Sequence, residues 1–194
     1  MGAKKSPGFD LITGRVIKEL PEKCIRFLTI LYNAVLRLQY FPDQWKIAEI
    51  IMINKPGKNP NDVHSYRPIS LLPLFSKLFE KLLLTRLKAV IINNKLIPNH
   101  QFGFRERHST VEQVHRIADR IDKTLHRKEY CSAAFLDISQ AFDKVWHEGL
   151  LYKIKLNFPY HYYQIIQTYL EFRHLYVRYN NTQTKLCPIK SGVQ

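Results

Sequence analysis

The sequence predicts a helix-rich α+β fold. Long stretches in which apolar residues recur at every third or fourth position are typical of helices, and short apolar runs bounded by turn residues are typical of strands. A chain of 194 residues with 45% hydrophobic and 12% aromatic content is long enough to bury a core. Because no repeat or low-complexity segment interrupts the chain, we expect a continuous fold, either one compact domain or two lobes.

Helical spacing of apolar residues is found in five stretches, which predicts helices over residues 21–39, 71–93, 109–128, 141–156 and 160–172. Pro73 lies in the first turn of the second stretch, where a helix tolerates proline. Ser109 and Glu112 have the spacing of a capping box, which predicts where the third helix begins. Phe158-Pro159 separates the last two helices.

Short apolar runs predict strands over residues 45–54, 131–138, 175–179 and 185–189. The first strand leads into a turn at 55–58, and residues 60–68 are expected to form an exposed connection. The second is small, apolar and alternating, and we interpret it as a core strand with Asp137 at its end. Asn180-Asn181 is expected to form the turn between the last two strands.

The chain is strongly basic, with 30 Lys and Arg residues against 16 Asp and Glu residues and a formal net charge of +14. This excess favours a polyanionic partner, for which nucleic acid and an anionic membrane surface are the candidates. Lys, Arg or Asn breaks the apolar stretches before the roughly 20 residues that a membrane span requires. We therefore expect nucleic acid as the partner, and no membrane.

The cysteines and the amino-terminal residues bear on the cellular compartment. Each cysteine lies in or beside an apolar run and none forms a CxxC pair, which predicts buried thiols in a reducing environment: Cys24, Cys131 and Cys187. The first residues carry charge but no apolar segment of the kind found in secretory signals. The nucleus or the cytoplasm is therefore expected, rather than secretion.

Asp137 is the residue whose position most needs an explanation. An aspartate that ends an apolar strand is costly to bury unless it is paired or binds a metal. It could cap the following helix or act as a metal ligand, and the spacing alone leaves both possibilities open. Ser139 could provide the cap instead. Asp143 is interpreted as an acid in the first turn of that helix, where it complements the helix dipole.

Cations flank the polar connection after the first strand. Lys55, Lys58 and Arg67 could hold phosphate groups, and arginine offers bidentate geometry for them. The alternative is that these side chains are simply solvated, which we favour for Lys58. The sequence contains no Gly-rich phosphate loop and no metal-binding pattern among its eight histidines.

Five blocks of the sequence carry a family resemblance: Lys5–Gly8, Phe41–Lys46, Ser65–Pro73, Gln101–Thr110 and Phe135–His147. In this order and at this spacing they resemble reverse transcriptases of non-LTR (LINE-type) retrotransposons, and the Jockey group most closely. The match spans nearly the whole chain. Each block alone is weak evidence, but five in order are specific.

The resemblance implies RNA-directed DNA polymerase activity on a right-hand polymerase fold with a short, mostly antiparallel sheet. Residues 1–130 would form the fingers, with an N-terminal extension helix, and residues 131–194 part of the palm, without a thumb. In this family the aspartate matched by Asp137 holds two divalent ions, normally Mg²⁺, for nucleotidyl transfer. The backbone carbonyl of Ile138 would be a second metal contact.

The resemblance also assigns binding residues. Phe142 matches the aromatic gate that excludes a ribose 2′-hydroxyl, and Lys55 and Arg67 match finger residues that grip the incoming triphosphate. Arg105 is a candidate for contact with the template. The implied partners are an RNA template, a DNA primer and deoxynucleoside triphosphates, with a possible upstream endonuclease domain in the full element product.

Two departures from the family pattern matter. Phe9-Asp10-Leu11 stands where the family usually has Pro-Asp-Gly, and the sequence ends before the Asp-Asp motif. After Asp143 the only acids are Glu148 and Glu171, so one carboxylate remains for two Mg²⁺ ions, and we expect this chain alone to be inactive. The alternatives are a non-catalytic nucleic-acid-binding remnant, or a nuclease that uses Asp137, Asp143 and Glu148.

Overall fold

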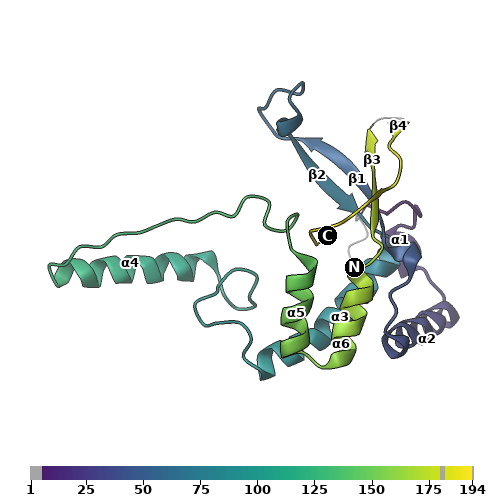
Figure 1. Cartoon of the computed structure of the whole chain (residues 1–194), viewed down its shortest axis with the longest axis horizontal. Helices are drawn as coiled ribbons and strands as arrows, with labels where there is room; N and C mark the ends of the chain where they lie inside the picture. The colour runs from purple at the N-terminus through teal and green to yellow at the C-terminus, as the bar shows by residue number, and fades with distance from the viewer. Residues whose placement is uncertain (1–5, 180–181, 194) are drawn as a thin grey trace. The chain divides into compact units, whose positions relative to one another are not determined.

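A computed structural model describes residues 6–179 and 182–193 of the chain (Figure 1). Lys5, Asn180-Asn181 and Gln194, which the sequence analysis names, lie outside the described residues. The chain divides into two compact units, one of residues 1–89 with 140–194 and one of residues 90–139. Six α-helices and a five-stranded sheet within the described part confirm the predicted helix-rich α+β class.

The first unit holds most of the helices: α1 (Gly14–Lys18), α2 (Glu22–Leu38), α3 (Leu74–Asn93, which continues into the second unit), α5 (His147–Asn157) and α6 (Tyr160–Leu170). The predicted helices at 21–39, 71–93 and 160–172 are confirmed. Their apolar faces meet in an aromatic core in which Phe41 and Phe79 are completely buried. The Phe41 ring lies edge-on to Tyr169 of α6 at 4.9 Å between centroids, so the core joins helices that are distant in sequence.

The sheet consists of β1 (Ile47–Asn54), β2 (Tyr66–Leu71), β3 (His174–Tyr179), β4 (Thr182–Gln183) and β5 (Cys187–Pro188). The order is β2-β1-β3-β4, and β5 also pairs with β3. β1 pairs antiparallel with β2 and parallel with β3, while β4 and β5 are both antiparallel to β3. β3 of the predicted palm thus pairs with β1 of the predicted fingers, and the boundary at residue 130 stays a prediction.

β2 corrects the expectation of an exposed connection over residues 60–68. A short 3₁₀ helix, Val63–Ser65, leads directly into the strand. Pro68 lies within the strand, opposite Met52 of β1. β2 is an edge strand, and a proline without an N–H group is tolerated there because one side of the strand needs no hydrogen-bonded neighbour.

The expected core strand over residues 131–138 is wrong. The segment forms no strand, and all of its residues are exposed, including Phe135 at 90% and Leu136 at 94%. A strand satisfies its backbone groups only through a neighbour, and no described residue pairs with this segment. The expectation of buried thiols is also wrong, because Cys24, Cys131 and Cys187 are all exposed.

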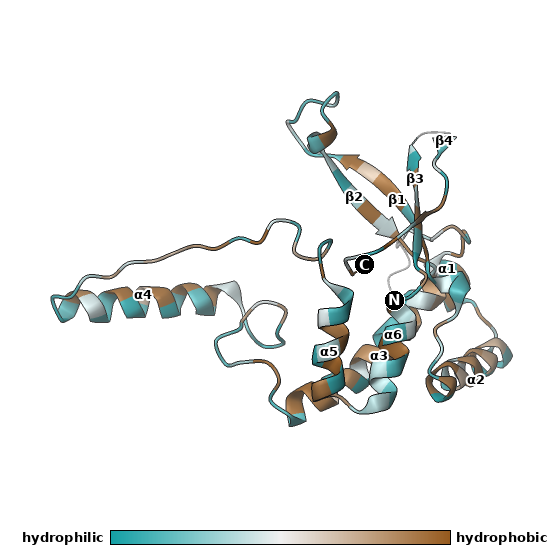
Figure 2. Cartoon of the chain, in the orientation of Figure 1, coloured by the Kyte–Doolittle hydropathy of each residue, from teal (hydrophilic) through white to brown (hydrophobic). Residues whose placement is uncertain are grey.

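The second unit contains α4 (Thr110–His126), and its predicted capping box is confirmed. The Ser109 hydroxyl accepts a hydrogen bond from the Glu112 N–H at 3.3 Å, and the Glu112 carboxylate accepts one from the Ser109 N–H at 2.8 Å. The apolar residues of α4 form one stripe along the helix (Figure 2), and each is between 41% and 64% exposed: Val111, Val114, Ile117, Ile121 and Leu125. Local capping therefore specifies this helix without a covered apolar face.

α5 begins at His147, six residues later than predicted, so Asp143 precedes the helix and is not in its first turn. The residues before α5 are instead bound to the segment around Gly192. The Val193 N–H donates to the Phe142 carbonyl at 2.9 Å, and the His147 ring Nε2 lies 2.7 Å from the Gly192 carbonyl. These long-range hydrogen bonds use backbone carbonyls that a helix over residues 141–146 would need, so the helix begins only at His147.

Candidate functional site

The β1–β2 hairpin brings Lys55 and Arg67 to one face of the sheet. Arg67 lies opposite Ile53 in the antiparallel register. Lys55 follows Ile53 by two positions, and the ladder still continues there, because the Lys55 N–H donates to the Ser65 carbonyl at 2.7 Å. Side chains two positions apart share a face, and diagonal neighbours across a ladder are about 7–8 Å apart. The two predicted phosphate-binding cations are therefore neighbours.

The loop at the end of this hairpin is held by its own hydrogen bonds. The Lys55 ammonium donates to the His64 carbonyl at 2.7 Å, and the Asp62 carboxylate accepts from the His64 N–H at 2.9 Å. The Tyr66 hydroxyl donates to the Pro60 carbonyl at 2.9 Å. Lys55 is thus fixed at the tip of the hairpin, while Lys58 is exposed in the loop itself.

A third cation, Arg178, lies on the same face, and the sequence analysis missed it. In the parallel register of β1 and β3, Arg178 is aligned with Ile51, which shares the face of Ile53 and Lys55. Arg178 Nε lies 2.6 Å from a carboxylate oxygen of Glu49, whose side chain is only 3% exposed. The Arg178 side chain is 47% exposed, so its guanidinium is paired with Glu49 and is also accessible to solvent.

Glu49 also accepts a hydrogen bond from the Tyr176 hydroxyl at 3.1 Å. Partial burial raises the pKa of Tyr176, and the Glu49 carboxylate raises it further, so the hydroxyl keeps its proton and donates. A glutamate inside the apolar run 47–54 and an arginine inside the run 174–179 are the only sequence signals for this pair. Neither signal gives the register that joins them.

The two faces of the sheet differ in character. One face packs in a small apolar cluster of Ala48, Ile50 and Leu72. The other carries the three cations, Lys55, Arg67 and Arg178, which we call the cationic face. Ile53 and Ile69 lie on the same face as these cations, and their side chains are partly exposed. Glu49 shares this face but is buried and paired with Arg178 and Tyr176, so the face carries a net positive charge and can bind a ligand with several negative charges.

The other predicted site residues are divided between the units. Phe142 belongs to the first unit, where its ring is 59% exposed and its carbonyl accepts from Val193. Asp137 and Ile138 belong to the second unit, in the exposed segment that follows α4. Arg105 also belongs to the second unit, and its guanidinium donates to the Pro98 carbonyl at 3.3 Å, so it braces its own loop.

The residues present do not fit a complete metal site. Within residues 6–179 and 182–193, no group of three or more His, Cys, Asp or Glu side chains could hold a metal ion. Asp137 belongs to the second unit, whereas Asp143 and Glu148 belong to the first, so a nuclease that uses these three acids stays a prediction. In the same described part, no helix has the length and apolar character needed to cross a bilayer.

Comparisons with known proteins agree with the order of the sequence blocks. The family described as "Reverse transcriptase (RNA-dependent DNA polymerase)" matches residues 53–194. The chain is 49% identical over 190 residues to the "Probable RNA-directed DNA polymerase from transposon BS" and 48% identical over 190 residues to the "RNA-directed DNA polymerase from mobile element jockey", both of Drosophila melanogaster. Each match covers 98% of this chain and 21% of the relative.

A third relative, the "Probable RNA-directed DNA polymerase from transposon X-element" of Drosophila melanogaster, is 46% identical over 189 residues. That match covers 97% of this chain and 21% of the relative. The chain thus spans about a fifth of the length of the curated relatives it matches.

Proposed function

Because the chain belongs to the reverse transcriptase (RNA-dependent DNA polymerase) family, we propose that it is the fingers and part of the palm of an RNA-directed DNA polymerase from a non-LTR retrotransposon of the jockey kind. The observation that carries the proposal is the hairpin register, which puts Lys55 and Arg67 side by side on the cationic face. In the intact enzyme this face binds the triphosphate of an incoming deoxynucleotide.

The chemistry of the cationic face suits this task. A triphosphate carries negative charge on several oxygens that point in different directions. Donors that approach it from more than one strand can therefore contact more of these oxygens. Arg67 offers bidentate donors from β2, Lys55 a point charge from the hairpin tip, and Arg178 a guanidinium from β3. Phosphoryl transfer depends mainly on positioning and on electrostatic stabilisation, and fixed cations provide both.

The remaining assignments concern the sugar and the metal. Phe142 excludes the ribose 2′-hydroxyl and so selects deoxynucleotides, and Asp137 with the Ile138 carbonyl contributes to a divalent-metal site. Mg²⁺ requires near-octahedral oxygen coordination, which these two groups cannot complete, so the other ligands come from further carboxylates of a longer polypeptide. RNA template and DNA primer are the macromolecular partners, with Arg105 near the template. An upstream endonuclease domain and a nuclear or cytoplasmic location also belong to the proposal.

A non-catalytic nucleic-acid-binding role for this chain is the second candidate. It is favoured by one observation: the cationic face is formed within the first unit, while no group of three or more His, Cys, Asp or Glu side chains in the described residues could hold a metal ion. For this role the affinity for RNA falls steeply with added salt, because phosphate contacts release counterions. Salt-independent binding, or no binding, contradicts it.

Primer extension on an RNA template tests the polymerase proposal in a polypeptide of the relatives' length. Arg67→Ala and Lys55→Ala are expected to lower kcat/KM for deoxynucleotides by about tenfold to hundredfold each, mainly through KM. Lys58→Ala is the matched control, since it removes the same charge from the same loop but not from the cationic face. Equal activity of the Arg67→Ala and Lys58→Ala variants contradicts the assignment of the face.

Two further variants test the remaining assignments. Asp137→Ala is expected to abolish extension, and Phe142→Ala to admit ribonucleotides that the parent enzyme rejects. Extension by the isolated chain that is unaffected by Asp137→Ala contradicts the central metal assignment.

A further inference from the structure

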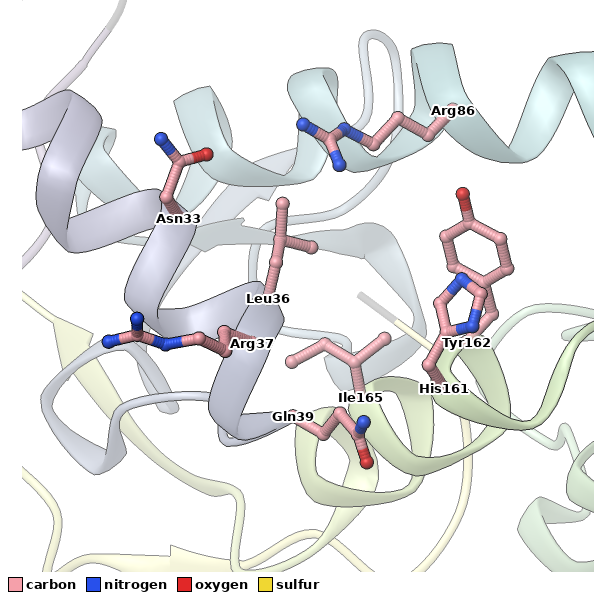
Figure 3. Close-up of a pocket in the computed structure, with 8 residues that line it drawn as sticks. All are labelled: Asn33, Leu36, Arg37, Gln39, Arg86, His161, Tyr162 and Ile165. Atoms are coloured by element: carbon pink, nitrogen blue, oxygen red, sulfur yellow. The ribbon is translucent and has the colours of Figure 1, made fainter.

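A second cationic site lies away from the sheet, in a pocket between three helices of the first unit (Figure 3). The pocket has a volume of about 310 Å³ and is lined from α2, α3 and α6 and the residue that ends α2: Asn33, Leu36, Arg37, Gln39, Arg86, His161, Tyr162 and Ile165. None of these residues belongs to the cationic face. The pocket therefore needs its own explanation.

Buried contacts hold the walls of this pocket in place. The Tyr32 hydroxyl on α2 donates to the Phe75 carbonyl of α3 at 3.0 Å. At the other end of α2, the Thr168 hydroxyl of α6 donates to the Gln39 carbonyl at 3.2 Å and accepts from the Phe41 N–H at 3.2 Å. All three helices also share the aromatic core. A ligand therefore meets a preformed site, which lowers the entropic cost of binding.

The residues that line the pocket carry positive charge and no negative charge. Arg37 and Arg86 line it together with His161, and none of its lining residues is acidic. In the described part of the chain, neither guanidinium has an ion-pair partner within 4.0 Å. Figure 3 shows Arg86 reaching from α3 toward Asn33 and Leu36, whereas Arg37 lies on α2 at the rim, with its guanidinium directed away from the other lining side chains. A cation that reaches into a pocket without an acidic neighbour favours an anion, and arginine favours phosphate.

The floor of the pocket is apolar and aromatic, which a site for inorganic phosphate would not need. Ile165 is 1% exposed, and the rings of His161 and Tyr162 lie 4.1 Å apart between centroids. Cations at a rim with aromatic rings beside them are the combination that binds single-stranded nucleic acid, where the phosphate meets the cation and the base meets the ring. The volume is at the small end of ligand pockets.

We infer that this pocket binds one nucleotide unit, with Arg86 on the phosphate, Tyr162 and His161 against the base or sugar, and Arg37 adding charge at the rim. The ligand class is a nucleoside phosphate, present either in a single-stranded nucleic acid or as a free nucleotide. The inference deepens the proposed function by adding a second contact for nucleic acid. The cationic face and the pocket share no residue, so each can fail without the other.

The test measures binding of a short, labelled oligoadenylate to the full chain by fluorescence anisotropy over a series of salt concentrations. Arg86→Ala is expected to lower the affinity about fivefold to tenfold and to reduce the slope of log affinity against log salt by about 0.7, the value of one phosphate contact to a single strand. Tyr162→Ala is expected to lower the affinity about fivefold and to leave the slope unchanged, because stacking releases no counterion.

Arg15→Ala is the control, since it removes an equal charge from an exposed position on α1, outside the pocket. It is expected to change the affinity by less than about twofold, and Arg86→Lys is expected to restore the slope. Equal effects of Arg86→Ala and Arg15→Ala overturn the inference, as does a Tyr162→Ala variant that folds and binds like the parent.

Competition with adenosine monophosphate separates the two sources of the ligand. Displacement of the oligonucleotide assigns the pocket to free nucleotides, and retention assigns it to a strand. The Lys55→Ala and Arg67→Ala variants, measured in the same assay, show whether the cationic face binds RNA independently of the pocket.

Discussion

Loss of Arg178 is expected to destabilise the sheet because it leaves the Glu49 carboxylate buried without its cation. The pair is 2.6 Å long, and the Glu49 side chain is 3% exposed. Removing one member of a fully buried pair costs about 3–5 kcal/mol. The Arg178 side chain is 47% exposed, so solvent screens this pair, and the Tyr176 hydroxyl remains bound to Glu49. We therefore expect Arg178→Met to cost about 2 kcal/mol of unfolding free energy.

The complementary change, Glu49→Gln, removes the charge but keeps an oxygen that accepts from Tyr176. It is expected to lower the free energy of unfolding by about 1.5 kcal/mol. This cost has two sources: the ion pair with Arg178 is lost, and the hydrogen bond from Tyr176 is no longer charge-assisted. The double variant buries no charge and is expected to cost about 2 kcal/mol rather than the sum of about 3.5, which gives a coupling energy of about 1.5 kcal/mol.

Urea unfolding of the four proteins measures this coupling energy, with the fluorescence of the buried Trp45 as the signal. The control is the same cycle on Glu22 and Arg26 of α2, a pair 2.7 Å long whose side chains are 79% and 76% exposed. That pair is expected to couple by less than about 0.5 kcal/mol. If the Glu49–Arg178 cycle couples no more strongly than the exposed pair, the reasoning from burial is refuted.

Three further predictions concern a buried acid, a cap and a glycine. Burial raises the pKa of Glu80, so protonation of this carboxyl stabilises the folded protein. This stabilisation is complete below the ordinary glutamate pKa and is lost as pH rises through the raised pKa. Glu80→Gln should therefore increase the urea midpoint at neutral pH and give no increase near about pH 4. Ser109→Ala should cost about 1 kcal/mol in α4, measured as faster amide exchange there, and unchanged exchange contradicts the cap. Gly192→Ala should cost at least about 1 kcal/mol by urea unfolding, because φ is +87° and a Cβ atom would lie 2.6 Å from the Asp143 carbonyl, whereas Gly103→Ala, with open space around it, should cost less.

Helices were predicted well because their signal is local and repeated. α2 and α3 each carry an apolar residue at every third or fourth position, and the core confirms that this face is buried at Tyr32, Val35, Phe79 and Leu83. α4 was predicted from its apolar stripe together with a capping box that is contained in four consecutive residues. In each case the residues that form the element also specify it.

Strands were predicted less well because their signal depends on a partner. β2 was missed, since Pro68 is compatible with a strand only at an edge, and edge position is a property of the sheet. Residues 131–138 were wrongly expected to form a strand, since their apolar alternation is necessary for one but does not supply a neighbour. The same limit applied to the site. Lys55 and Arg67 were named from their places beside the turn and the polar connection, and the resemblance then assigned them to the triphosphate. Arg178 was missed because it joins them only through the β1–β3 register.

In the proposed function, phosphate binding and catalysis depend on different units of the chain and are therefore expected to be separable. The cationic face and the helical pocket both lie in the first unit, which has its own aromatic core. Asp137 lies in the second unit, where the apolar stripe of α4 and the segment around Asp137 are both exposed. A stripe of that size costs free energy in water unless another surface covers it, so the second unit is expected to reach its functional conformation only when further residues pack against it. Contacts to phosphate should therefore be measurable in this chain, whereas we expect the proposed metal-dependent chemistry to require a surface that covers the apolar stripe of α4.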